Sequence, residues 1–97
     1  MDPSPVVFDR PELGRYDIVV GDQVAVLEYR RKDGQILLVH TEVPESLRGE
    51  GLADLLVRHA MDEARRSGTR VVVRCPFVTA WLRRHHEYDD LIDARPP

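Results

Sequence analysis

The sequence is poor in three features that mark common classes of protein. It has a single cysteine, Cys75, so no internal disulfide forms and the thiol is expected to be free. It has neither a hydrophobic leader nor a long apolar run, so we expect a cytoplasmic protein without membrane contacts. Its net charge of −3 argues against a broad basic face that binds nucleic acid, although a small anion pocket is compatible with that charge.

The chain is also short, which limits its organisation. Its 97 residues, 42% of them hydrophobic and 32% charged, describe one small globular domain and leave no room for a second. Two prolines and no periodicity mark residues 1–5 as a flexible tail. We therefore predict a single domain over residues 6–97.

The first half of the chain has the alternation and composition of β-strands. A short apolar run at 6–8 is followed by the longer runs RYDIVV (15–20), QVAVLEYRR (23–31) and QILLVHTEV (35–43). The dipeptide Asp33-Gly34, between the last two runs, suits a type I′ hairpin turn. These features predict an antiparallel meander.

From residue 52 the hydrophobic spacing becomes helical. Leucines and alanines recur at helical intervals from Leu52 to Ala64, and Gly68 ends the helix. TRVVVRC (69–75) then reads as a buried strand, which a right-handed crossover makes parallel to the preceding one. Pro76 stops that strand and starts a short amphipathic helix over 77–86, with Phe77 and Trp81 expected in the core. The pattern predicts an α/β (α+β) fold: a mostly antiparallel sheet of four or five strands with a parallel final pair, one crossover helix and a short C-terminal helix.

The loop PESLRGEG (44–51) sets two glycines directly before the first helix. Gly49 and Gly51 leave the backbone bare at a helix amino end, where free N–H groups and the helix dipole attract anions, and Arg48 adds positive charge. The loop is not a Walker phosphate loop, because no Lys-Ser/Thr follows it. It is not a Rossmann fingerprint either, because Asp54 takes the third glycine position. A tight turn that needs glycine only for its positive φ explains the pattern equally well.

Further segments carry a specific resemblance to a known family. Arg48-x-x-Gly51-x-Ala53 follows a strand that ends in Val43-Pro44. Together with YR (29–30), HTEVP (40–44), CPFV (75–78) and HHEYDDL (85–91), this loop resembles the compact, single-domain branch of the GNAT N-acetyltransferase superfamily. Nearly the whole chain takes part in the resemblance.

The resemblance implies a sheet whose last two strands splay apart around acetyl-CoA, the acyl donor. It implies that the CoA portion is held by Thr41, Glu42, Val43, Leu47, Arg48, Gly49, Glu50, Gly51, Leu52 and Ala53. The positions that match the catalytic pair of the branch are His40 and Cys75. The implied activity moves an acetyl group to an amine of a small molecule, a protein lysine or a protein amino terminus, in a monomer or weak homodimer.

His40 and Cys75 offer two chemical routes. An amine acceptor is protonated near neutral pH, and a histidine, with an unperturbed pKa of ~6.5, is suited to remove that proton. A cysteine thiolate would instead take the acetyl group first, through an acetyl-Cys75 intermediate. Strand alternation predicts that His40 shares a face with Ile36, Leu38 and Glu42.

Each of these assignments has a structural alternative. Cys75 is also read as a small buried hydrophobic residue, and His40 as a hydrogen-bonded structural histidine. A zinc site is disfavoured because the chain lacks paired ligand spacing. For the whole chain, the alternatives to an enzyme are a catalytically silent acyl-CoA-binding module and a structural partner domain.

Overall fold

The structure, a computed structural model, describes residues 5–94 of the chain. All but Pro5 of the predicted tail, and residues 95–97, lie outside the described residues. The strands are β1 (Phe8–Arg10), β2 (Arg15–Val20), β3 (Gln23–Lys32), β4 (Gln35–Glu42), β5 (Arg70–Val73) and β6 (Ile92–Ala94). The helices are α1 (Leu52–Ser67) and α2 (Pro76–Leu82), with 3-10 turns η1 (Pro11–Leu13), η2 (Glu45–Leu47) and η3 (His86–Leu91).

All the strands of the described residues join one sheet in the order β1-β2-β3-β4-β5-β6. The first four are antiparallel, and both β4–β5 and β5–β6 are parallel. The predicted α/β fold with parallel C-terminal strands is therefore confirmed, but the sheet of the described part has six strands rather than four or five. The missed strand, β6, has three residues, which is too short for a pattern of alternation to show.

The predicted turn at Asp33-Gly34 is also present. Asp33 and Gly34 have φ values of 51° and 76°, as a type I′ turn requires of both central residues. Lys32 pairs with Gln35 across the turn, which fixes the register of β3 against β4. The predicted first strand is shifted, because pairing begins at Phe8 and continues to Arg10 rather than covering residues 6–8.

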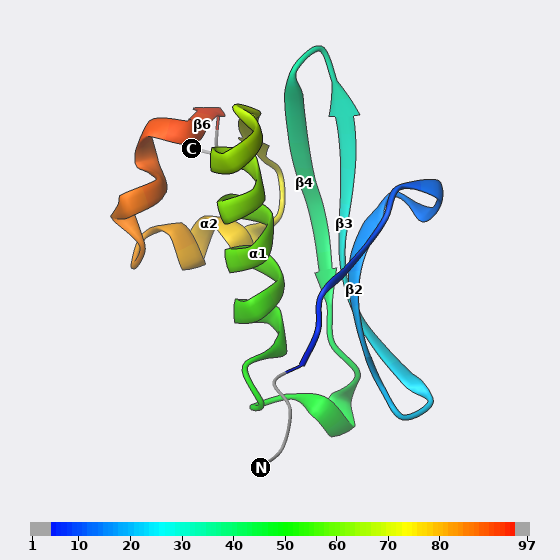
Figure 1. Ribbon diagram of the computed structural model, residues 1–97. Helices are drawn as coiled ribbons and strands as arrows, with labels where there is room; N and C mark the ends of the chain where they lie inside the picture. Colours follow the sequence, from blue (N-terminus) through cyan, green and yellow to red (C-terminus); the bar gives the residue numbers. More distant parts are fainter. Residues whose placement is uncertain (1–4, 95–97) are drawn as a thin grey trace.

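α1 covers one face of the sheet and supplies the middle of the core. Its buried stripe consists of Leu52, Leu56, Val57, Ala60, Met61 and Ala64. These side chains pack in one hydrophobic cluster with residues from the strands, among them Leu27 and Leu38. In Figure 1, α1 stands between strands β2–β4 on one side and α2 with the C-terminal segment on the other. The opposite face of β2–β4 carries no helix in the described part of the chain.

The second helix is shorter than the sequence predicted. α2 ends at Leu82, and the N–H groups of Arg84 and His85 bond to carbonyls three residues back, which tightens the chain out of the α-helix. Trp81 is 1% exposed and lies in the core, as predicted. Phe77 is 39% exposed, so its predicted place in the core is wrong. A helix of seven residues fills its buried side with Val78 and Leu82 beside the tryptophan, and Phe77 falls outside that side.

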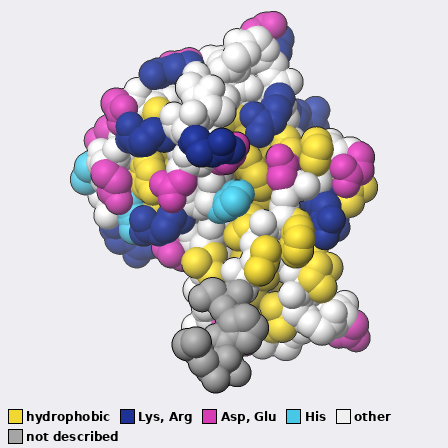
Figure 2. All heavy atoms as spheres, viewed as in Figure 1, with side chains coloured by type: hydrophobic (Ala, Val, Ile, Leu, Met, Phe, Trp, Pro, Cys, Tyr) yellow, Lys and Arg dark blue, Asp and Glu magenta, His cyan; other side chains and the backbone are white. Residues whose placement is uncertain are grey.

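The surface seen in Figure 2 divides into two parts. Charged side chains of both signs cover the helical side, and hydrophobic side chains gather on the side of the strands. The exposed hydrophobic residues include Val6, Phe8, Val19 and Val20, which belong to the β1–β2 region. Among the described residues no helix has the length and apolar character needed to cross a bilayer.

Candidate functional site

The strands β4 and β5 diverge midway along β4. Their parallel pairing runs from Gln35 opposite Arg70 to Leu38 opposite Val73. The carbonyl of Leu38 then accepts two N–H groups, from Arg74 at 2.9 Å and from Cys75 at 3.1 Å. Beyond this shared acceptor β5 turns into α2, while β4 continues to Glu42. The end of β4 therefore borders a space that β5 does not fill.

A β-bulge in β4 decides which side chains face that space. Tyr29 of β3 lies opposite Leu38, but Glu28 lies opposite His40, so Val39 is an extra residue in β4. The bulge reverses the alternation of every later residue in the strand. His40 consequently shares the open face with Glu28, and the prediction that it shares a face with Ile36 and Leu38 is wrong. Thr41, opposite the buried Leu27, takes the face that α1 covers.

A cavity of about 550 Å³ lies between the end of β4, the glycine loop, the first turn of α1 and α2. All the residues predicted to hold CoA line it except Glu50, an exposed residue that lies outside its lining. His40 also lines it, together with two residues that the sequence did not single out as site residues, Asp54 and Phe77. An acidic residue in the first turn and an aromatic after Pro76 are signals too common to have identified them.

The glycine loop leaves its backbone open towards this cavity. Gly49 and Gly51 have φ values of 87° and 78°, and a Cβ at either position would have no neighbour within 4 Å. No side chain caps the amino end of α1, whose first helical bond is from the N–H of Leu55 to the carbonyl of Gly51. The preceding N–H groups thus have no intrahelical acceptor. Arg48 lies beside them, with its Nε 3.3 Å from the carbonyl oxygen of Val43.

The two predicted catalytic residues occupy different places. His40 is exposed and lines the cavity. Cys75 is 3% exposed and does not line it, and its Sγ lies 3.3 Å from Oγ1 of Thr41. No hydrogen bond joins His40 to Cys75 in the part of the chain that the structure describes. His40 therefore lines the cavity itself, whereas Cys75 is in contact with Thr41, a residue that lines it.

Asp54 ties the first turn of α1 to the second helix. The indole N–H of Trp81 donates a hydrogen bond of 2.5 Å to Oδ1 of Asp54. The guanidinium of Arg58, one turn later on α1, lies 5.3 Å from the centre of the Trp81 ring. These contacts fix the wall of the cavity that α1 and α2 share.

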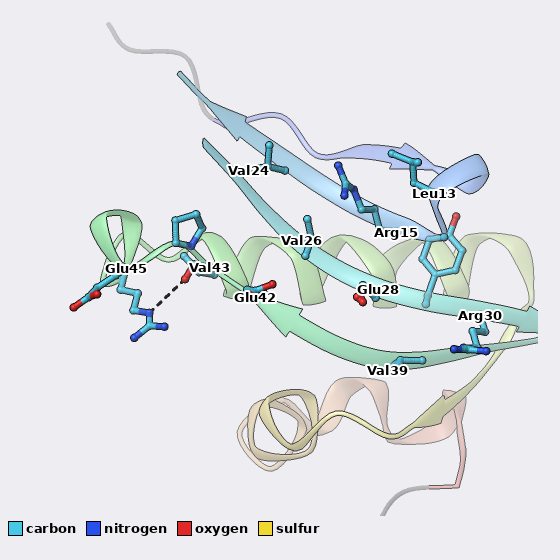
Figure 3. Close-up of a pocket in the computed structure, with 14 residues that line it drawn as sticks. Leu13, Arg15, Val24, Val26, Glu28, Arg30, Val39, Glu42, Val43 and Glu45 are labelled. Carbon is cyan, nitrogen blue, oxygen red and sulfur yellow. Dashed lines mark hydrogen bonds between the residues drawn. The ribbon is translucent and has the colours of Figure 1, made fainter. Parts of the chain in front are cut away.

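A second and larger depression, of about 810 Å³, follows the open face of the sheet. Figure 3 looks onto this face with α1 behind the strands, and shows Glu28 and Glu42 on the near side of β3 and β4. Val24 and Val26 line the groove beside them. The groove and the cavity meet, because Glu42, Val43 and Arg48 line both.

The charges in the groove are unevenly neutralised. Of its arginines, Arg15 pairs with Asp17 at 3.3 Å and Arg48 donates to the Val43 carbonyl. In the described part of the chain, no ion pair is formed by Glu28, Glu42 and Glu45 or by Arg30, which all line the groove. Tyr29 lies at the edge of the groove, and burial, then its hydrogen bond with Asp9, raises its pKa to about 12. Its phenol is therefore neutral near pH 7 and is excluded as a proton acceptor there.

The diverging parallel strands, the bare loop before a helix and the cavity between them are the features that the sequence resemblance implied. A sequence model of the GCN5-related N-acetyl-transferase family matches residues 15–91. The chain belongs to this family, so the predicted class of enzyme, an acetyltransferase, is confirmed.

A solved structure shows the same fold. The solution structure of a Staphylococcus aureus protein assigned as a GCN5-like N-acetyltransferase matches with a TM-score of 0.72. The match covers 94% of this chain and 90% of that one at 21% sequence identity. At 21% identity the match establishes a shared fold.

Proposed function

We propose that this protein transfers an acetyl group from acetyl-CoA to a primary amine, with His40 as the proton acceptor. The observation that carries the proposal is the cavity of about 550 Å³, because it joins the free end of β4 to the bare glycine loop. A thioester arm needs a narrow space beside a strand, and a pyrophosphate needs N–H donors without side chains in the way. The cavity provides both.

The residues present fit the acyl donor. The loop from Leu47 to Ala53 presents backbone amides at the positive end of α1, and the empty space at Gly49 and Gly51 admits phosphate oxygens close to the backbone. Arg48 supplies a cation at the same mouth. Acetyl-CoA would supply a reactive thioester carbonyl. The residues of the chain would bind acetyl-CoA and accept the proton that the amine loses.

The acceptor amine is proposed to enter from the groove on the open face. That groove is lined by arginines as well as glutamates, but where it reaches the cavity, at Glu42, the carboxylates of Glu28 and Glu42 offer a local partner to an ammonium group. Val24 and Val26 offer an apolar surface to the aliphatic part of such an amine. We therefore propose an amine with a positive charge at neutral pH as the acceptor, from a small molecule or a protein.

The route that the positions favour is direct transfer. His40 lines the cavity and shares the open face with Glu28, so it can take the proton that the acceptor nitrogen must lose. His40 takes one proton from the ammonium group, and the free amine then attacks the thioester carbonyl. The new N–C bond forms as the C–S bond breaks, and the second proton of the nitrogen passes to the CoA thiolate, which leaves as the free thiol of CoA. The covalent route would require the thioester to reach the sulfur of Cys75, which is buried and in contact with Thr41.

A mass spectrum taken during turnover tests the proposal. The protein is mixed with acetyl-CoA and a lysine peptide or a simple aliphatic amine, and both the product and the intact protein are weighed. Direct transfer predicts acetylated amine, no acetyl adduct on Cys75, strong loss of rate in His40→Ala and retained rate in Cys75→Ala. A hydroxylamine-sensitive adduct that is absent in Cys75→Ala would establish the covalent route instead.

One observation favours a second candidate, a catalytically silent acyl-CoA-binding module. No helix of the described residues covers the groove, so an acceptor bound there has a wall on one side only. Calorimetric binding of CoA with no acetylated product from any amine class would support the silent module. Absence of CoA binding would overturn both candidates.

A further inference from the structure

Among residues 5–94, the hydroxyl of Thr41 is the polar group that lies within hydrogen-bonding distance of the thiol. Cys75 is buried and free, and its Sγ lies 3.3 Å from Oγ1 of Thr41. Within the described part of the chain no other hydrogen bond reaches that sulfur. Water is largely excluded as well, because the residue is 3% exposed. Loss of the Thr41 hydroxyl would therefore leave the sulfur without a polar partner.

Two separate features of the backbone create this contact. The first is the bulge at Val39, which turns Thr41 rather than His40 towards the side of β4 that α1 and α2 cover. The second is the double acceptor at Leu38, which holds the N–H of Cys75 at 3.1 Å and sets the thiol beside the diverging end of β4. A regular β4 would have put a histidine there. The contact is thus specified by the geometry of the splay.

Thr41 contacts the thiol of Cys75 and also belongs to the lining of the cavity. It lines the cavity of about 550 Å³, and Cys75 does not. Thr41 is thus a cavity-lining residue whose hydroxyl contacts the thiol. We propose that Thr41 is a positioning residue that fixes the sulfur of Cys75 and donates a hydrogen bond to its thiolate.

The proposal rests on the proposed function only for its consequence in turnover. The hydrogen bond itself concerns two side chains of this chain and is measurable without any CoA. A hydroxyl that donates to a thiolate stabilises the charged form, whereas a threonine that only fills space does not. Valine has nearly the shape of threonine and lacks the hydroxyl, and serine keeps the hydroxyl and lacks the methyl group.

The test is a titration of the thiolate by its ultraviolet absorbance in the apo protein. The single cysteine gives one signal, and a Cys75→Ala partner of each variant removes the contribution of the tyrosines. In Thr41→Val the midpoint should move to higher pH by about one unit, the size expected for a lost hydrogen bond to a charged group. In Thr41→Ser the midpoint should stay within ~0.3 units of wild type.

Near-ultraviolet circular dichroism of each variant verifies that the fold is kept. If Thr41→Val does not fold, Thr41→Ala removes the same hydroxyl and takes its place. A folded hydroxyl-free variant that titrates like wild type overturns the proposal. Equal shifts in Thr41→Ser and Thr41→Val overturn it too, because the methyl group and not the hydroxyl would then be responsible.

Turnover supplies a second, independent readout. If transfer is direct, Thr41→Val should keep the wild-type kcat, as Cys75→Ala does. If transfer passes through acetyl-Cys75, Thr41→Val should lower kcat more than it changes the KM for acetyl-CoA, and Thr41→Ser should restore kcat. If the wild-type protein binds CoA without turnover, the proposed function fails, and the titration still decides whether Thr41 positions the thiol. The two failures are therefore distinguishable.

Discussion

The two ends of α1 both rely on a glycine in the left-handed conformation, and they are otherwise opposite. At the carboxyl end, Gly68 has a φ of 71° and its N–H group bonds to the carbonyls of Ala64 and Arg65. The N–H of Thr69 also bonds to Ala64, at 2.9 Å. At the amino end, Gly51 has a φ of 78°, and no side chain caps the helix.

Gly68 takes part in a closed cap at one end of the helix, whereas Gly51 leaves the backbone at the other end accessible. The carboxyl end satisfies its carbonyls with a closed cap, as most helices do. The amino end leaves its donors unused beside a cavity, a state that costs stability unless a ligand completes it. The proposed function assigns these free donors to the phosphates of CoA, and four experiments test that proposal.

The largest effect is expected at Asp54, which anchors the amino end in place of a cap. Asp54→Ala removes the acceptor of the Trp81 indole N–H, and the free energy of unfolding should fall by about 2 kcal/mol because a buried donor is left unpaired. Urea denaturation followed by the fluorescence of the single tryptophan measures this loss. Asp54→Asn keeps an acceptor and should lose less than half as much. Equal stability of all three proteins would show that the bond does not form in solution.

Next in size is the effect of a methyl group at each glycine. Gly51→Ala and Gly68→Ala place a Cβ in the same unfavourable conformation, and in both the Cβ meets nothing within 4 Å. Both should lose a similar free energy of unfolding, of about 1 kcal/mol. Only Gly51→Ala should weaken CoA binding, by tenfold or more (~1.4 kcal/mol), because its Cβ enters the cavity mouth. Calorimetry that finds equal affinities in the two variants would contradict the assignment of the loop.

A smaller effect is expected from the charges beside the open end. Arg48→Ala should weaken CoA binding about three- to fivefold at low salt and less at high salt, since an exposed cation is screened within ~8–10 Å. Glu50→Gln is the matched control. Because Glu50 does not line the cavity, the affinity of the Glu50→Gln variant for CoA should differ from that of wild type by less than about twofold. A larger change in Glu50→Gln than in Arg48→Ala would mean that the loop turns its other side to the ligand.

The smallest effect concerns the closed end and depends on pH. A hydrogen bond from Arg65 lowers the pKa of Asp90, and hydrogen bonds from Gln35 and Arg70 lower the pKa of Asp93. Both pKa values are lower in the folded than in the unfolded state, so the stabilisation is present above the ordinary aspartate pKa of ~3.9 and is lost as pH falls through the folded values.

Urea midpoints measured between neutral pH and about pH 3 reveal this loss. Asp90→Asn should remove part of the acid sensitivity while leaving CoA affinity unchanged, because Asp90 does not line the cavity. A pH dependence identical to that of wild type would show that the Arg65 contact is not maintained in solution.

Local sequence patterns predicted most of the architecture. The turn at Asp33-Gly34, the start of α1 at Leu52 and its end before Gly68 follow from turn chemistry, helical periodicity and capping, all of which act over a few residues. The residues that line the cavity of about 550 Å³, other than Asp54 and Phe77, were predicted as site residues through a resemblance of motifs. Their residue types alone were compatible with a simple turn.

The arrangement around Cys75 could not be predicted in the same way. A bulge arises where two strands of fixed twist must keep their pairing on both sides of an extra residue, and Val39 itself carries no mark of it. One inserted residue moved His40 to the open face and Thr41 to the thiol. Phe77 was misplaced for a related reason, because the length of α2 depends on where the chain must turn to reach β6.

The sequence by itself determined β2 to β5, α1, the glycine loop and the family, because propensity, periodicity and motif are properties of neighbouring residues. Only the tertiary structure decided that His40 borders the cavity, that Thr41 lines it and contacts Cys75, and that the groove on the open face of the sheet meets it at Glu42. These relations depend on the register between strands that lie far apart in the chain. A shift of one residue reverses the face of every side chain that follows it.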